Sequence, residues 1–146
     1  MATFRIKRFN PEKQPEPYFE EFELDIPDGA TLLDCMNQIK WTLDGSLSYR
    51  MSCRSAICGS CAVKANGHAL LACQRQGEHL LDNDDTITLE PLGNMKPVKD
   101  QVVDFTPFWD KINKVKPYLE PKDEPPAKER NQSPEEFRII DDSSTC

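Results

Sequence analysis

The sequence contains little of what a membrane-spanning, exported or nucleic-acid-binding protein requires. Its longest apolar runs, such as residues 69–72, are far shorter than the ~20 residues of a membrane helix. Lys and Arg number 18 against 25 Asp and Glu, a net charge of −7, so a basic surface for nucleic acid or anionic lipid is missing. The first residues have no apolar signal segment, and Glu12 is too early an acidic residue for a transit peptide. These absences predict an intracellular chain with no membrane span and no nucleic-acid partner.

The residue patterns of substrate chemistry are also missing. The two histidines, His68 and His79, do not form a metal-binding pair with any cysteine. No Ser-His-Asp arrangement, phosphate-binding loop or paired-carboxylate site is evident in the sequence. Substrate chemistry is therefore expected on a partner. What the chain does contain is six cysteines, although the cytosol would keep simple disulfides reduced. Either most of them bind metal, or they are scattered core residues.

Proline and charge divide the chain into three predicted segments. Five of its 12 prolines lie between residues 117 and 134, in a stretch that is charged and poor in apolar residues. We expect a compact domain over residues 1–95, a helical extension over 96–116 and an extended linker over 117–146. The helical expectation rests on apolar residues spaced roughly helically from residue 98 to 115, with Thr106-Pro107 as a possible helix start.

The first domain begins with two predicted strands followed by one helix. Apolar and charged residues alternate over 4–7 and 22–26, and a proline-rich hairpin connection over 11–17 would join these strands. Thr31 and Asp34 resemble a capping box, and apolar residues recur at helical spacing to Ile39, which predicts a helix over about 31–41. On its apolar face Cys35 is expected to be a small core residue rather than a metal ligand.

A long loop, a hairpin and a further strand complete the predicted domain. Residues 43–59 have little periodicity, and a loop of this length inside a compact domain is usually functional. Asn66-Gly67 is a strong hairpin signal between two short apolar runs, because both turn residues tolerate positive φ. Another strand is predicted over 86–89. The order of elements indicates an α+β fold, a small sheet crossed by one helix.

Four of the cysteines fall within 21 residues: Cys53, Cys58, Cys61 and Cys73. Their spacing, C-x4-C-x2-C-x11-C, begins with the gaps typical of plant-type [2Fe-2S] sites, in which thiolates hold each iron. The first three lie on the long loop, and the fourth follows a hairpin strand that returns to the same end of the sheet. Small residues between them would let backbone N–H groups approach the sulfur atoms.

Other uses of these cysteines fit the pattern less well. Structural zinc sites usually have two short Cys pairs with a longer spacer, whereas one nine-residue stretch here supplies three ligands. Disulfides do not suit the expected compartment. A thiol oxidoreductase would need a helix beginning at Cys58 and Cys61, yet a strand pattern follows them. Arg50 and Arg54 flank the cysteines and could offset the charge of a cluster, meet a partner, or simply be solvated.

The segment over residues 49–74 closely resembles the amino-terminal [2Fe-2S] domain of the iron–sulfur subunit of succinate dehydrogenase and fumarate reductase. The x11 gap before the fourth cysteine is typical of this family, and the similarity covers residues 3 to about 137. Further matches lie at residues 5–11, 28–34, 99–104 and 112–119. The resemblance implies a β-grasp fold of the plant-type ferredoxin kind. It also implies that the four cysteines are the ligands of one [2Fe-2S] cluster, with Cys61 where some members have Asp.

What the resemblance implies about function is electron transfer within a larger complex. Such a subunit accepts electrons from the FAD of a flavoprotein subunit and passes them toward quinone. Family members continue into a domain with [4Fe-4S] and [3Fe-4S] clusters, which meets a membrane-anchor subunit. Cys146 falls where the first ligand of the next cluster is expected, so we expect a fragment of such a subunit. The expected location is the cytoplasmic side of a prokaryotic membrane, peripheral to it. The alternatives are a free-standing soluble [2Fe-2S] ferredoxin and a zinc-stabilised interaction module.

Overall fold

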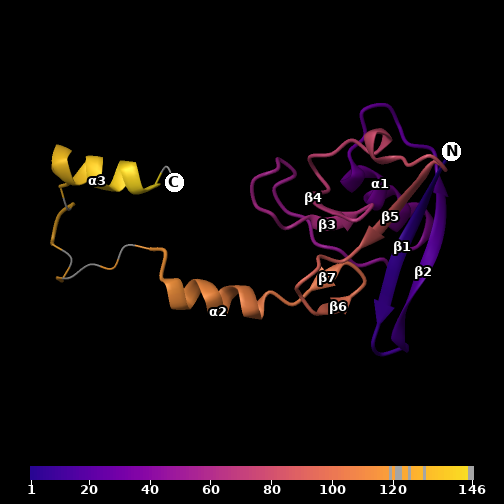
Figure 1. Cartoon of the computed structure of the whole chain (residues 1–146), viewed down its shortest axis with the longest axis horizontal. Helices are drawn as coiled ribbons and strands as arrows, with labels where there is room; N and C mark the ends of the chain where they lie inside the picture. Colours follow the sequence, from indigo (N-terminus) through magenta and orange to yellow (C-terminus); the bar gives the residue numbers. More distant parts are fainter. Residues whose placement is uncertain (119, 121–122, 125, 130, 145–146) are drawn as a thin grey trace. The chain divides into compact units, whose positions relative to one another are not determined.

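The computed structural model describes residues 1–118, 120, 123–124, 126–129 and 131–144 (Figure 1). The chain divides into two compact units, Met1–Lys111 and Ile112–Cys146. Among the described residues, no helix combines the length and the apolar character needed to cross a bilayer. Cys146, which the resemblance marks as a further cluster ligand, lies outside the described residues.

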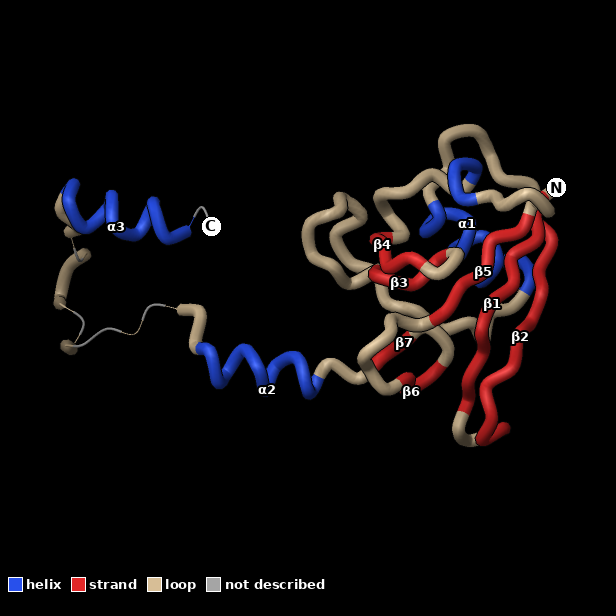
Figure 2. Tube along the Cα trace, in the orientation of Figure 1, coloured by secondary structure: helices blue, strands red, loops and turns tan. Residues whose placement is uncertain are grey.

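The first unit is built on a five-stranded mixed sheet (Figure 2). Its strands are β1 Ala2–Asn10, β2 Gln14–Leu24, β3 Ala62–Ala65, β4 His68–Leu71 and β5 Thr86–Glu90, in the spatial order β2-β1-β5-β3-β4. β1 pairs antiparallel with β2 and parallel with β5, and β5 pairs antiparallel with β3. The predicted α+β fold is confirmed. β1 and β5 are parallel neighbours although they lie far apart in the sequence, so the chain must cross from one end of the sheet to the other between them. The segment between β2 and β5 makes this crossover.

Helix α1, Leu32–Gln38, packs its apolar face on this sheet. Thr31 caps it through a complete capping box with Asp34, as the sequence predicts, and the chain continues into a π-helical turn, η1, Ile39–Leu43. Fully buried core side chains come from α1, from η1 and the loop that follows it, and from strands β1 and β5, and they include Phe4, Ile6, Leu32, Leu33, Met36, Ile39, Leu47, Ile87 and Leu89. Burial of each such side chain stabilises the fold by about 1.5–3 kcal/mol. Cys35 lies among them, fully buried, as predicted.

The first hairpin differs from the sequence prediction in its connection. β2 begins at Gln14, so the turn is short, and Pro15 and Pro17 lie inside the strand rather than in a loop. β2 is at the edge of the sheet, where a proline removes no hydrogen bond of the ladder. The strand also ends at Leu24, which places Ile26 outside it although Ile26 still packs against the core.

The second hairpin and the last sheet strand confirm the prediction. Asn66 and Gly67 have φ values of 46° and 84° and join β3 to β4, as a tight turn of this sequence requires. A 3-10 turn, η2 Glu78–Leu80, and an acidic turn then lead into β5.

The predicted helical extension over residues 96–116 is wrong in its first half. Residues Pro97–Lys99 and Val102–Val103 form a small antiparallel ribbon, β6 and β7, and helix α2 begins only at Thr106 and ends at Val115. The turn between β6 and β7 depends on Asp100, which has a φ of 47° and is 1% exposed. Apolar spacing alone did not reveal this turn, because Asp100 is stabilised by residues far away in the sequence. The division into segments 1–95, 96–116 and 117–146 itself remains a prediction.

The second unit contains a helix where an extended linker is predicted. Helix α3 covers Pro134–Ser144. Its first turn is capped by Ser133, whose hydroxyl accepts from the Glu136 N–H while the Glu136 carboxylate accepts from the Ser133 N–H. This reciprocal capping box, followed by proline at the first helical position, is a local start signal that the composition of the segment obscured.

Candidate functional site

One long connection carries three of the four clustered cysteines. Residues 44–61 join η1 to β3 without a helix or strand, and Cys73 follows directly after the end of β4. Figure 1 shows this loop beside β3 and β4. Cys53 and Cys58 are exposed, Cys73 is half-buried, and Cys61 is buried at 4% exposure. The site therefore has one face in the domain and one at the surface.

Cys53 and Cys58 form a first pair that is tied by reciprocal contacts. The Cys53 N–H donates to Cys58 Sγ at 3.5 Å, and the Cys58 N–H donates to Cys53 Sγ at 3.4 Å. The Ser55 N–H is a second donor to Cys53 Sγ, at 3.4 Å. The loop thus turns back on itself so that its amides point inward at sulfur.

Cys61 and Cys73 form the second pair, and one amide joins it to the loop tip. Cys73 is the cysteine that affects the pKa of Cys61, and the Ala56 N–H donates to Cys73 Sγ at 3.3 Å. Ala56 lies between the members of the first pair in sequence, so its contact brings the loop tip and the end of β4 together. The structure therefore gathers all four predicted ligands around the same short stretch of backbone.

The backbone of this loop adopts left-handed conformations at three positions. Arg54 and Ala56 have φ values of 57° and 58°, each costing about 1–2 kcal/mol for a residue with a side chain, and Gly59 has a φ of 73°. Alternation of right- and left-handed residues turns successive N–H groups to one side and forms a concave anion-binding surface. A Cβ at Gly59 would meet no atom within 4 Å, so the conformation rather than space favours glycine there.

The two pairs differ in the ionisation of their thiols. Hydrogen bonds from Ser60 and from the Cys53 backbone lower the pKa of Cys58 to about 6, so this thiol is poised to become a thiolate. Burial, together with the neighbouring Cys73, raises the pKa of Cys61 above its usual value. Thiolates are the form that binds metal, and amide donors stabilise them. Ser60 is a contributor that spacing alone did not single out.

This donor set fits a dinuclear cluster. Each iron of a [2Fe-2S] cluster takes two thiolates, and the structure offers two pairs of thiols with amide donors aimed at sulfur. The pairing therefore favours a two-iron centre over the four-cysteine zinc site that the sequence left open.

Comparison with known proteins agrees with this geometry. Residues 3–110 match the family described as the 2Fe-2S iron-sulfur cluster binding domain. The chain belongs to this family. Membership establishes that it carries a [2Fe-2S] cluster-binding domain.

Similarity to individual curated proteins extends over most of the chain. The succinate dehydrogenase iron-sulfur subunit of Coxiella burnetii is 38% identical over 99% of this chain and 60% of its own length. The 8-methylmenaquinol:fumarate reductase iron-sulfur subunit of Wolinella succinogenes is 43% identical over 94% of this chain and 44% of its own length. The chain thus spans about half the length of the curated relatives it matches.

A solved structure supports the fold. The Mycobacterium smegmatis Sdh1 complex in the apo form contains a chain that superposes with a TM-score of 0.79, at 24% identity. The match covers 99% of this chain and 59% of the other. The cluster-binding domain described above therefore has a known architecture.

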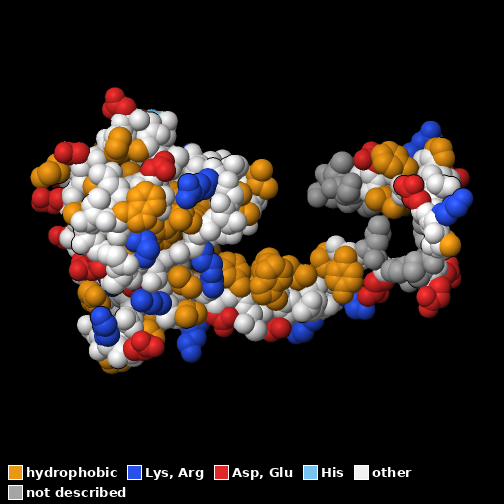
Figure 3. Space-filling view, turned by 180° about the vertical axis from the view of Figure 1, so that it is seen from behind, with side chains coloured by type: hydrophobic (Ala, Val, Ile, Leu, Met, Phe, Trp, Pro, Cys, Tyr) orange, Lys and Arg blue, Asp and Glu red, His pale blue; other side chains and the backbone are white. Residues whose placement is uncertain are grey.

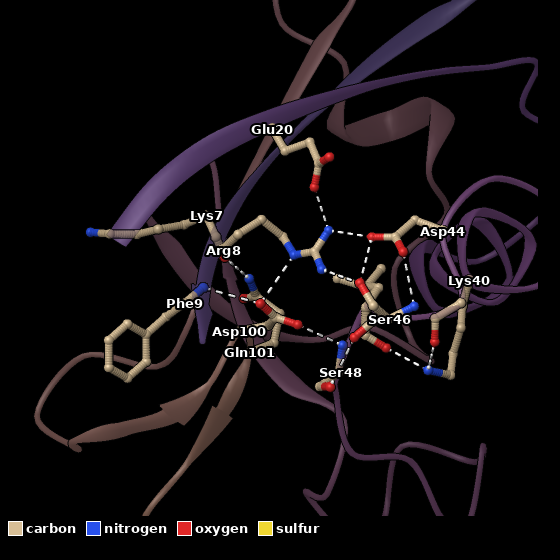
Figure 4. A network of polar contacts seen from close by, with 12 residues as sticks. Lys7, Arg8, Phe9, Glu20, Lys40, Asp44, Ser46, Ser48, Asp100 and Gln101 are labelled. Atoms are coloured by element: carbon tan, nitrogen blue, oxygen red, sulfur yellow. Dashed lines mark hydrogen bonds and ion pairs between the residues drawn. The ribbon is translucent and has the colours of Figure 1, made fainter. Parts of the chain in front are cut away.

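The base of the cysteine loop is held by a polar network around Arg8 (Figure 4). Arg8, 5% exposed on β1, pairs with Glu20, with Asp44 Oδ2 at 2.5 Å and with Asp100 Oδ1 at 3.0 Å. It also donates to Ser46 Oγ at 2.9 Å. One guanidinium thus joins β1, β2, the start of the loop and the β6–β7 turn of the cluster-binding domain.

Asp100 completes this network on the side of the loop. Its Oδ2 accepts from the Ser48 N–H at 2.9 Å and its Oδ1 accepts from the Phe9 N–H at 3.0 Å. The Gln101 N–H then donates to the Ser48 carbonyl at 3.1 Å. These contacts fix the loop five residues before Cys53. Sequence reasoning missed Asp100 as a site-forming residue.

The charges of this network stabilise one another. Burial alone would lower the pKa of Arg8, but its bonds with Asp44 and Asp100 outweigh burial and raise it. For Asp44, the effect of burial is outweighed by the Ser46 amide and by Arg8, which lower its pKa to about 2. Both groups are therefore ionised throughout the physiological range.

Proposed function

We propose that this chain is the electron-transfer iron–sulfur part of a succinate dehydrogenase or fumarate reductase. In this role it accepts electrons from the FAD of a flavoprotein subunit and passes them toward quinone. The observation that carries the proposal is the loop with two thiol pairs joined by inward-pointing amides. The names of the Coxiella and Wolinella relatives supply the identity of the complex.

The ligands proposed for the cluster are Cys53 and Cys58 for one iron and Cys61 and Cys73 for the other. When bound, a [2Fe-2S] cluster supplies a one-electron carrier whose potential depends on net charge, hydrogen bonds to sulfur and solvent exposure. The chain contributes to each of these factors. Its amides from Ser55, Ala56 and Cys58 donate to ligand sulfur, and burial of Cys61 excludes water from one side of the site.

In the proposed complex, substrate chemistry and electron transfer would take place on different subunits. Substrate oxidation or reduction would take place on the flavoprotein. The [4Fe-4S] and [3Fe-4S] clusters and the contact with a membrane-anchor subunit would belong to the part of such a subunit that this chain does not span. The complex would place the chain at the cytoplasmic side of a membrane, peripheral to it.

Mixing the chain with a partner tests this proposal. The full 146-residue chain is loaded with iron and sulfide and combined with the flavoprotein subunit of a bacterial succinate dehydrogenase. We expect a complex by gel filtration and reduction of the chain's iron centre on addition of succinate, followed by EPR. A control with malonate, which competes with succinate at the flavoprotein, suppresses the reduction.

Two results would count against the proposed complex. Reduction by dithionite but not by succinate, with no complex formed, would favour a free-standing ferredoxin. Failure to acquire any iron centre would contradict electron transfer altogether.

A further inference from the structure

Arg50 is neither a proposed cluster ligand nor a member of the Arg8 network. It lies in the loop three residues before Cys53, and its Nη1 donates to the Val103 carbonyl at 2.6 Å. Its guanidinium also lies over the Phe105 ring, 5.2 Å from the ring centroid. One contact with the end of β7 and one with Phe105, two residues further on, therefore hold a side chain that begins in the cysteine loop.

Arg50 lines a cavity that it shares with a proposed cluster ligand. The cavity has a volume of about 440 Å³, and its lining residues are Arg50, Cys58, Gly59, Ser60, Phe105, Phe108 and Trp109. Among the described residues that line it, Arg50 carries the charge. One wall is therefore the ligand Cys58 with its neighbours, and the facing wall is aromatic.

The aromatic wall strengthens the field of this charge. Phe105 is half-buried and stacks edge-on against Phe108, which in turn contacts Trp109. Figure 3 shows hydrophobic side chains in a row along the α2 segment. Low-dielectric walls focus the field of a charge and reduce its screening by water. A cation held against them acts more strongly on a neighbouring sulfur than one surrounded by solvent.

Arg54 provides an internal comparison. It is in the same loop and is closer in sequence to Cys53, but its Nη2 contacts Met51 Sδ at 3.9 Å and its charge acts on the Tyr49 hydroxyl. Both side chains are guanidinium cations. They differ in which neighbours hold the guanidinium.

We propose that Arg50 is a positioning residue that favours the reduced state of the cluster site, by holding a positive charge beside Cys58 while tethering the loop to Val103 and Phe105. The inference rests on the proposed cluster ligands. An added electron increases the negative charge on a site of four thiolates, and a nearby cation stabilises that extra charge. Arg54 contributes less, because its guanidinium contacts Met51 Sδ and Arg54 is not among the residues that line this cavity.

A redox titration of matched variants tests this role. The full chain is reconstituted with ferrous iron and sulfide, and dithionite supplies one electron per site while it is itself oxidised. The reduced fraction is followed by EPR at a fixed ambient potential. We expect R50Q to lower the ratio of reduced to oxidised sites about tenfold, which corresponds to a shift of about 59 mV for one electron. R54Q, which removes the same charge from the same loop, lowers the ratio by less than about threefold.

The variant R50K distinguishes the effect of the positive charge from the effect of the contact with Phe105. It keeps the positive charge but loses the planar stacking on Phe105, and we expect its ratio to stay within about threefold of the unmodified chain. If R50Q does not take up iron, R50M, which removes the same charge but keeps an apolar side chain that can lie on Phe105, takes its place with the same expected tenfold fall. Equal shifts in R50Q and R54Q, no shift in R50Q, or a tenfold fall in R50K would each overturn the inference. An unmodified chain without an iron centre would instead contradict the proposed function.

Discussion

The two halves of the connection over residues 44–61 are held in different ways. The first half, residues 44–50, is fixed by protein alone, through the Arg8 network, the Asp100 turn and the Arg50 bond to Val103. The second half, residues 53–60, directs its amides at cysteine sulfur and includes three left-handed residues. The difference indicates that the fold itself holds the base, whereas the tip is completed by the cluster.

The largest expected effect is on the tip of the loop, residues 53–60, and leaves its base, residues 44–50, unchanged. Cys58→Ala removes one ligand of the exposed pair, and we expect the chain to lose its iron centre and visible absorption. The base does not depend on Cys58, so amide hydrogen exchange should increase over residues 53–60 and stay unchanged over residues 44–50.

Cys35→Ala is the matched control for that loss. Cys35 is fully buried in the core, and burial raises the pKa of its thiol to about 11, so it is poorly suited to bind metal. This variant should keep the iron centre. Loss of visible absorption in Cys35→Ala, with Cys58→Ala unaffected, would contradict the assignment of the ligands.

The next effect concerns the base. Arg8→Met removes the cation shared by three carboxylates and leaves Asp100, whose side chain is 2% exposed, buried without a counter-charge. We expect the free energy of unfolding in urea to fall by about 3–5 kcal/mol. The control is Glu90→Gln, which breaks the more exposed pairs with Lys7 and Lys64 and should cost about 0–1 kcal/mol. Equal losses in the two variants would show that the base is not held by Arg8.

A smaller effect is expected from the strained tip. Gly59→Ala forces a side chain into a φ of 73°, although the added Cβ has free space around it. The cluster-loaded chain should lose about 1–2 kcal/mol of stability in urea. Gly93→Ala is the control, since its Cβ would also meet no atom within 4 Å and its φ is not in the left-handed region. If both variants behaved alike, the left-handed turn at Gly59 would not be a source of strain.

The smallest effect is a dependence of the base on pH. The pKa of Asp44 is lowered from 3.8 to about 2 in the folded chain, so its ionised form stabilises folding. That stability is fully present above about pH 4 and is lost as the pH falls toward 2. Asp44→Asn should be less stable at neutral pH by on the order of 1 kcal/mol, and the difference should vanish near pH 2. A difference that grew on acidification would contradict the direction of this pKa shift.

Local signals in the sequence predicted the tip of the loop and several elements of the sheet. Each of these signals depends on residues that are close in sequence, so its geometry follows from the residue order. They are the cysteine spacing, the Asn66-Gly67 turn and the Thr31 capping box. The four cysteines as ligands remain a prediction that the geometry supports.

The base of the loop could not be predicted in this way. Asp100 bonds to Arg8, 92 residues earlier, and its turn interrupts an apolar spacing that indicated a helix. Long-range pairing of this kind leaves no periodic trace in the sequence. Pro15 and Pro17 illustrate the same limit, because their effect depends on whether a strand lies at the edge of the sheet. The capping box of Ser133, by contrast, is a local signal that the sequence contains.

Analysis of the metal centre of the purified 146-residue chain tests the central claim most directly. Iron, zinc and acid-labile sulfide are measured together, and an EPR spectrum is recorded after dithionite. The claim predicts about two iron and two sulfide per chain, with a rhombic signal in the reduced state. One zinc per chain, no sulfide and no signal would contradict it.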